Sequence, residues 1–134
     1  MDDKIKSLSE YRLEKSKKDL ETAQINLDHD MVNQSINRSY YSIFHALRAL
    51  LAYDSFDAKR HSSILGYFNK NYIASGKIKQ EYYKIIARAF DIRSKSDYQD
   101  FYIASKKEAK EQLKNAKEFV EMIIKYIREH KSDK

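Results

Sequence analysis

The chain has 134 residues and a formal net charge of +6, and it contains no cysteine, no proline and only two glycines. This length predicts one domain, residues 1–134, with its own core, and the lack of cysteine excludes disulfides and thiolate metal sites. So few helix breakers beside 34 % charged residues predict an all-α protein of long helices.

The composition also bears on location and ligands. The chain has no apolar run of about eighteen residues and no signal-peptide pattern, so we expect a soluble cytoplasmic protein without a membrane span. Its four histidines show no HxxxH or HExxH spacing, and we therefore expect no metal site and no cofactor. Because acidic residues are interspersed among the lysines, net charge alone does not identify a nucleic-acid-binding protein.

The first predicted helix covers about residues 7–27. It begins with a capping-box pattern at Ser7–Glu10, and leucines recur every seventh residue at Leu13, Leu20 and Leu27. Either Asp28 or Asp30 is the expected N-cap of a second helix, which continues to about Tyr53. The two helices are expected to form an antiparallel hairpin.

The second helix has two different faces. At about 100° per residue, one side collects the hydrophobic residues Ile36, Tyr40, Ile43, Leu47 and Leu50. The opposite side carries the polar and aromatic residues Arg38, Tyr41, His45 and Arg48. This second side is either packed inside a bundle or forms the wall of a polar groove.

A shorter third helix is predicted over residues 62–72, with Gly76 ending that unit. In the fourth helix, which begins near Ile78, the apolar stripe through Ile86 and Phe90 places Arg93 and then Asp97 at the next inward positions. A buried arginine is costly unless it is paired, so Arg93 needs a carboxylate, a ligand or an interface. The simplest partner is Asp97, one helical turn later.

The last helix has the clearest signals. A capping box at Ser105–Glu108 begins it, and inward residues follow at spacings of four and three: Ala109, Leu113, Ala116, Val120, Ile123 and Ile127. We expect the ends of the chain, about residues 1–6 and 129–134, to fray.

Two stretches resemble the paired signatures of the HEPN family (higher eukaryote and prokaryote nucleotide-binding domain). They are NRSYYSIFHALRALL at residues 37–51 and RSKSDYQDF at residues 93–101, with the similar segment KRHSSILGYF at residues 59–68 between them. The resemblance spans about residues 10–127. It implies an up-down bundle of four long helices plus a shorter fifth helix, which forms a homodimer with the signature arginines facing each other across a cleft.

In RNase members of this family, an arginine is followed after four residues by a histidine, and the pair cleaves RNA without a metal. Arg93 matches the arginine, but Tyr98 stands at the histidine position. A phenol with a pKa near 10 is a poor general base at neutral pH, whereas an imidazole with a pKa near 6.5 is well suited. The departure predicts weak or absent cleavage, unless His61 or His45 supplies the imidazole.

Three functions stay open. The first is a metal-independent ribonuclease that acts as a toxin paired with a minimal nucleotidyltransferase antitoxin; its catalytic residues would be Arg93, Tyr98, Asp97 and His61. The second is a non-catalytic module that binds RNA or a nucleotide, with Arg93 on phosphate. Further ligand-binding residues would be Arg38, Tyr41 and His45. The third is a helical oligomerisation or partner-binding module, in which these side chains serve an interface.

Overall fold

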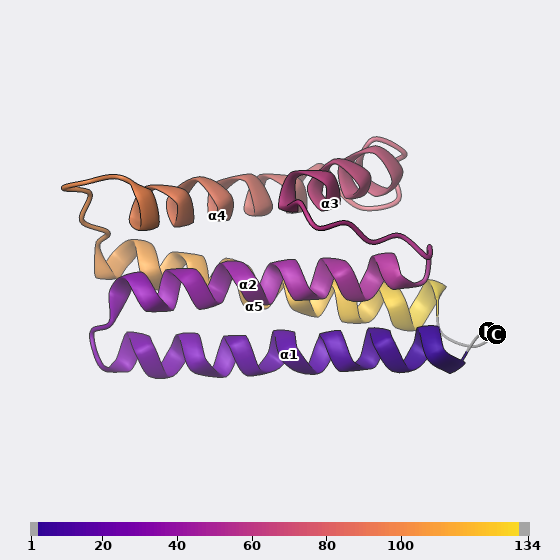
Figure 1. Cartoon of the computed structure of the whole chain (residues 1–134), viewed down its shortest axis with the longest axis horizontal. Helices are drawn as coiled ribbons and strands as arrows, with labels where there is room; N and C mark the ends of the chain where they lie inside the picture. Colours follow the sequence, from indigo (N-terminus) through magenta and orange to yellow (C-terminus); the bar gives the residue numbers. More distant parts are fainter. Residues whose placement is uncertain (1–2, 132–134) are drawn as a thin grey trace.

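Residues 3–131, which a computed structural model describes, form five α-helices and one π-helical turn, with no strand. The elements are α1 (Asp3–Asp28), α2 (Val32–Ala52), α3 (His61–Phe68), η1 (Asn69–Ile73), α4 (Gln80–Tyr98) and α5 (Lys106–His130). The four long helices alternate in direction, and α3 with η1 lies between α2 and α4 in the chain (Figure 1). The all-α class and the bundle architecture are confirmed.

Helix α2 lies at the centre of the bundle, between α1 and α4 and in front of α5 in Figure 1. Its predicted apolar side is buried, with each of these side chains at most 1 % exposed: Ile36, Tyr40, Ile43, Leu47 and Leu50. Burying a large aliphatic side chain stabilises a fold by about 1.5 to 3 kcal/mol, so this side holds much of the core. Small residues on the opposite side of α2 pack against α1, so the helix is covered on both sides.

Helix α1 meets α2 through a largely polar seam. Its buried residues recur at spacings of three and four: Ser9, Arg12, Ser16, Asp19, Ala23 and Leu27. Short hydroxyl side chains let the two backbones approach, and two of them donate across the seam to backbone carbonyls. Ser16 Oγ donates to the carbonyl of Ser42 at 2.6 Å, and Ser35 Oγ donates to that of Ala23 at 2.8 Å. The leucine stripe was therefore only partly right, because Leu13 and Leu20 are half-buried.

The helix starts test the capping predictions. Ser105 and Glu108 form the predicted capping box of α5: the Glu108 N–H donates to Ser105 Oγ at 3.0 Å, and the Ser105 N–H donates to Glu108 Oε1 at 3.1 Å. The pattern at Ser7 does not begin a helix, since α1 already begins at Asp3.

The predicted cap of α2 was wrong. Its N-cap is Met31, with no side-chain hydrogen bond. Asp30 instead adopts a left-handed conformation (φ 59°) in the tight turn between the helices, and its carboxylate pairs with Lys106 Nζ at 2.8 Å. The turn geometry therefore takes the aspartate away from the free N–H groups of α2.

Helix α4 buries Ile86, Ala89 and Ile92, so its stripe advances by steps of three from Ile86. Phe90, predicted to be inward, is 38 % exposed. Arg93 consequently lies at the edge of the buried face, and its side chain remains 14 % exposed.

Several further features complete the fold. The predicted third helix is divided into α3 and η1, and Gly76 makes the following turn with φ 80°. Residues 3–6 and 129–130 are helical, whereas 1–2 and 132–134 lie outside the described residues. No helix among the described residues is long and apolar enough to cross a membrane.

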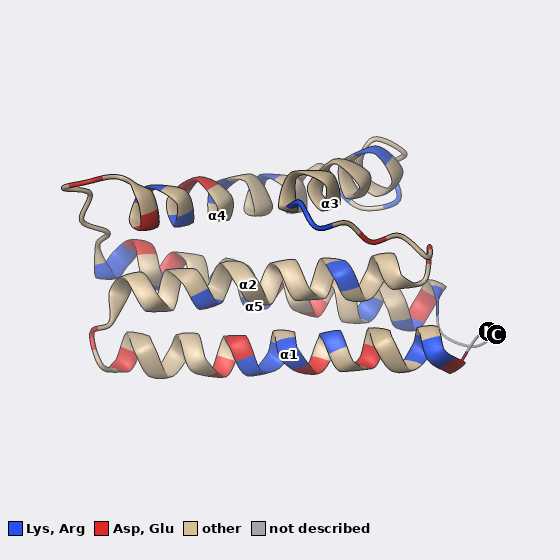
Figure 2. Cartoon of the chain, viewed as in Figure 1, with Lys and Arg blue, Asp and Glu red and all other residues tan. Residues whose placement is uncertain are grey.

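Acidic and basic residues alternate along α1, as expected for a solvated outer face (Figure 2).

Candidate functional site

Arg93 of α4 lies against the two adjacent tyrosines of α2. Its Cζ atom is 5.2 Å from the centre of the Tyr40 ring and 5.5 Å from that of Tyr41. Its Nη2 donates a long hydrogen bond of 3.3 Å to the Tyr41 hydroxyl. Aromatic faces stabilise a guanidinium by cation–π attraction without consuming its N–H donors. The tyrosine pair therefore holds the charge of Arg93 in a half-buried place.

The predicted pair between Arg93 and Asp97 is present, but it is incomplete. Arg93 Nε lies 3.0 Å from Asp97 Oδ2, yet the N–H is not aligned for a hydrogen bond with this or any other acceptor among the described residues. A guanidinium carries five N–H donors. Within residues 3–131 Arg93 makes one hydrogen bond, the long one to Tyr41, so most of its donors have no partner there.

Tyr98 covers Arg93 from the solvent side. Its ring centre is 5.7 Å from Arg93 Cζ, and the residue is 74 % exposed. An imidazole at this position would therefore lie beside the guanidinium, close to any phosphate that Arg93 binds.

His61, at the start of α3, reaches the neighbourhood of Arg93 through Tyr40. Its Nδ1 is 2.8 Å from the Tyr40 hydroxyl, and its ring packs on Phe44 with centres 3.9 Å apart. Burial, followed by the charges of Arg93 and Arg48, lowers the pKa of His61. Burial also raises the pKa of Tyr40 to about 12, so both groups are neutral near pH 7.

The bond to Tyr40 controls the chemistry of His61. When Tyr40 donates to Nδ1, the proton of the neutral imidazole resides on Nε2, which cannot then accept a proton. A base at Nε2 requires the other tautomer, in which Nδ1–H donates to the Tyr40 oxygen.

His45 and Arg38 both turn to Asp19 of α1. His45 Nδ1 lies 2.7 Å from Asp19 Oδ2, and Arg38 Nη1 donates to Asp19 Oδ1 at 3.0 Å. Arg38 also covers the Tyr41 ring at 5.0 Å. Of the residues predicted for the site, the structure thus groups Arg38, Tyr41, Arg93, Asp97 and Tyr98. His61 is linked to them through Tyr40 and by ring contact with Tyr41 at 5.8 Å, and His45 lies between Asp19 and the Tyr41 ring, 5.9 Å away.

Asp19, Asp57 and Tyr40 are polar residues of this region that the sequence interpretation missed. Asp57 pairs with Arg48 at 2.7 Å and with Arg12 at 3.1 Å, and these partners lower its pKa. Asp19 lies at the same three- and four-residue spacing as the buried residues of α1, and that spacing could have identified it. The place of Tyr40 on the core stripe concealed the role of its hydroxyl.

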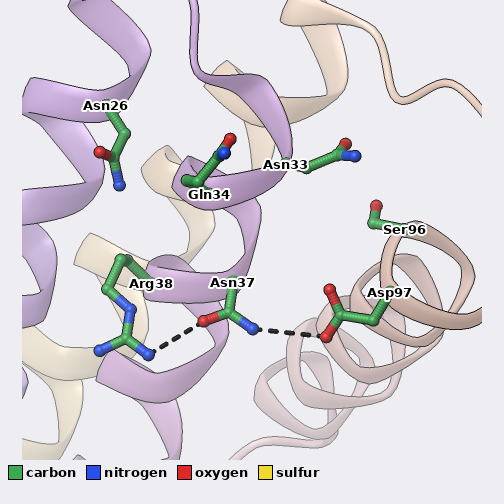
Figure 3. Close-up of a pocket in the computed structure, with 7 residues that line it drawn as sticks. All are labelled: Asn26, Asn33, Gln34, Asn37, Arg38, Ser96 and Asp97. Atoms are coloured by element: carbon green, nitrogen blue, oxygen red, sulfur yellow. Dashed lines mark hydrogen bonds between the residues drawn. The ribbon is translucent and has the colours of Figure 1, made fainter.

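Each of two grooves contains a residue that Arg93 contacts. One, of about 470 Å³, is lined by residues from α1, α2 and α4, and we call it the carboxamide groove (Figure 3): Asn26, Asn33, Gln34, Asn37, Arg38, Ser96 and Asp97. The other, of about 590 Å³, is an aromatic groove whose lining includes Tyr41, Phe44, His45, Arg48 and His61. Arg93 contacts Asp97 of the first and Tyr41 of the second. Within residues 3–131, no three His, Asp or Glu side chains are grouped to hold a metal ion.

Comparisons with known proteins cover almost the same residues as this bundle. The family model described as HEPN domain matches residues 9–128. A UPF0332 protein of Thermotoga maritima is 28 % identical over 122 residues, which cover 91 % of this chain and 92 % of the relative. Two proteins of Methanocaldococcus jannaschii are also similar. One, named "Putative toxin MJ0605", is 28 % identical over 87 % of each chain; the other, "Putative toxin MJ0142", is 29 % identical over 88 % of this chain and 80 % of its own.

Proposed function

We infer the function from one premise: the chain belongs to the HEPN domain family. We propose that it is the toxin component of a toxin–antitoxin pair, and that it binds RNA or a nucleotide in a cleft between two copies, with Arg93 on a phosphate. The toxin names of the two archaeal relatives support the first part of this proposal. The contacts of the Arg93 guanidinium support the second part, the binding of a phosphate.

That guanidinium is the single observation on which the binding proposal depends. A half-buried arginine with a merely structural role normally satisfies its donors with carboxylates or carbonyls. Arg93 is instead held by ring faces and an unaligned ion pair. A phosphate offers acceptors in the geometry that a planar guanidinium fork requires.

We further propose weak, metal-independent ribonuclease activity at this site. Arg93 would stabilise the negative charge that develops on phosphorus-bound oxygens when a ribose 2′-hydroxyl loses its proton, attacks the adjacent phosphate and displaces the 5′-oxygen of the next nucleotide, which takes up a proton; a 2′,3′-cyclic phosphate remains. Proton transfer then limits the rate, because Tyr98 is a poor base and the Nδ1 atom of His61 already engages Tyr40.

A specific observation favours a second candidate, a non-catalytic oligomerisation or partner-binding module. Phe101 is fully exposed and Ile103 is 87 % exposed, just beyond the C-terminal end of α4. Exposed apolar residues in such a cluster are typical of interaction sites. In this alternative, Arg93 serves the interface alone and does not bind phosphate.

Fluorescence anisotropy during a titration of labelled single-stranded RNA distinguishes the RNA-binding function from the oligomerisation module. We expect Arg93→Ala to weaken binding about ten- to a hundredfold, which corresponds to the roughly 1.5 to 3 kcal/mol of a charge-assisted hydrogen bond. The matched control is Arg88→Ala, since Arg88 is exposed on the same helix and should change affinity little. Equal affinities of natural protein and a folded Arg93→Ala variant would favour the oligomerisation module.

The family resemblance also suggests the partner. We propose a minimal nucleotidyltransferase as the antitoxin and the cytoplasm as the location of both proteins. Co-expression of the product of an adjacent nucleotidyltransferase gene should suppress growth inhibition by this chain. Inhibition that continues in the presence of such a product would contradict the pairing.

A further inference from the structure

The carboxamide groove contains polar side chains that nothing in the described part of the chain uses. The side-chain amides of Asn26, Asn33 and Gln34 have no hydrogen-bond partner there, and they surround the groove from α1 and α2 (Figure 3). The Ser96 hydroxyl lines the groove from α4; it is buried and also lacks a partner. A hollow lined by hydrogen-bonding groups from three helices, one of them buried and unpaired, is typical of a binding site.

The charges around this groove are already compensated. Arg38 pairs with Asp19 at 3.0 Å, and Asp97 pairs with Arg93 at 3.0 Å. Asn37 connects the two charged residues of the lining: it accepts from Arg38 at 2.9 Å and donates to Asp97 at 3.4 Å (Figure 3). The groove therefore presents neutral hydrogen-bonding groups, which suit a nucleobase better than a phosphate.

We propose that the carboxamide groove holds the nucleobase next to the phosphate bound by Arg93, that it contacts the Hoogsteen edge of this base, and that it therefore prefers adenine to guanine. This inference rests on the proposed function of Arg93. A base in the groove would be adjacent to that phosphate, because Asp97 belongs to the groove lining and contacts Arg93 directly.

The preference follows from the pattern of donors and acceptors. A carboxamide offers one donor and one acceptor side by side, which matches N6 and N7 of adenine. On this same Hoogsteen edge guanine presents two acceptors, N7 and O6, which an arginine or lysine binds best. Arg38, the cation in the groove lining, already donates through Nη1 to Asp19 and through Nη2 to Asn37.

The experiment is a titration with labelled uridine oligonucleotides that carry a single central adenine or a single central guanine. The natural protein should bind the adenine-containing RNA roughly fivefold or more tightly, as one bidentate base contact allows. Combining Asn33→Ala with Gln34→Met, which removes the two unpaired carboxamides of α2 while keeping the length of the second side chain, should bring the two affinities together. Both residues are exposed on α2, so the fold should tolerate the changes. The control is Asn115→Ala, a carboxamide on α5 outside the groove.

The outcomes distinguish this inference from the function on which it rests. If binding depends on Arg93 but the natural protein shows no adenine preference, or if the preference survives in the combined variant, the base site is wrong while the phosphate site stands. If no RNA binding depends on Arg93, both are wrong. A preference that disappears in the combined variant, with Arg93-dependent affinity for plain oligouridine unchanged, supports the base site.

Discussion

Arg93 is held by aromatic faces more than by its carboxylate neighbour. Rings at 5.2 and 5.5 Å stabilise the positive charge but accept few of its protons, whereas a bidentate carboxylate would occupy one edge of the fork. The tyrosine pair of α2 thus has two functions, since Tyr40 fills the core and both rings support the guanidinium. Replacing either ring would change the charge environment of Arg93 as well as the packing.

The pKa of His61 predicts how the free energy of unfolding changes with pH. Its pKa is lowered in the folded state, so below the ordinary value near 6.5 the unfolded chain binds more protons than the folded one. Acidification from pH 7 to about pH 5 should therefore reduce the free energy of unfolding, and His61→Gln should make that reduction smaller. Urea unfolding of the natural protein and of the variant at both pH values measures this reduction in the free energy of unfolding.

The control for this measurement is His29→Gln, in the exposed turn after α1. It should lose as much stability on acidification as the natural protein. If His61→Gln behaves like His29→Gln, the buried imidazole is not the group that responds.

Among the elements, the pairing of α1 with α2 depends on Asp19. Its carboxylate serves both Arg38 and His45, and its side chain is 11 % exposed. Asp19→Ala leaves these donors without their acceptor inside the seam, and we expect a loss of about 2 to 3 kcal/mol in the free energy of unfolding. Glu21→Ala, at an exposed position of the same helix, should change it by less than about 0.5 kcal/mol. Equal shifts of the two urea midpoints at an unchanged slope would contradict this role of the seam.

The helices themselves were predictable from local signals. Periodic apolar residues gave both faces of α2, and the capping box at Ser105 gave the start of α5. The burial of Asp19 and the contact of Tyr40 with His61 could not be predicted in the same way. Each joins residues about twenty positions apart or more, and it depends on how two helices pack rather than on the sequence of either.

The candidate site also combines a feature that the local sequence predicted with a feature that depends on how the helices pack. Arg93 followed by Asp97 gave a correct local pair, because i,i+4 neighbours meet on any helix. The carboxamide groove was not predicted, since its lining comes from α1, α2 and α4 and carries no short motif. The phenylalanine at position 90 was assigned to the core because a step of four was assumed where α4 advances by three.

For the whole molecule, the exposed apolar residues after α4 predict a homodimer. Phe101 and Ile103 lie a few residues beyond Asp97 and Tyr98, so an interface there would bring the Arg93 sites of two copies close together. Sedimentation equilibrium at micromolar concentration should give about twice the chain mass of 15.9 kDa. Combining Phe101→Ser with Ile103→Ser should shift the equilibrium toward the monomer.

The matched control for the dimer is Leu8→Ser, which changes an exposed leucine on α1. It should leave the dimer intact. A natural protein that remains monomeric throughout the micromolar range would rule out the two-copy cleft.

Product analysis on labelled single-stranded RNA in the presence of EDTA tests most directly whether Arg93 is the centre of the chemistry. The natural protein should give little or no cleavage, and Tyr98→His, which supplies an imidazole beside the guanidinium, should increase products with 2′,3′-cyclic phosphate ends. Adding Arg93→Ala to that variant should abolish them. Strong metal-independent cleavage by the natural protein that survives Arg93→Ala would place the chemistry elsewhere in the molecule.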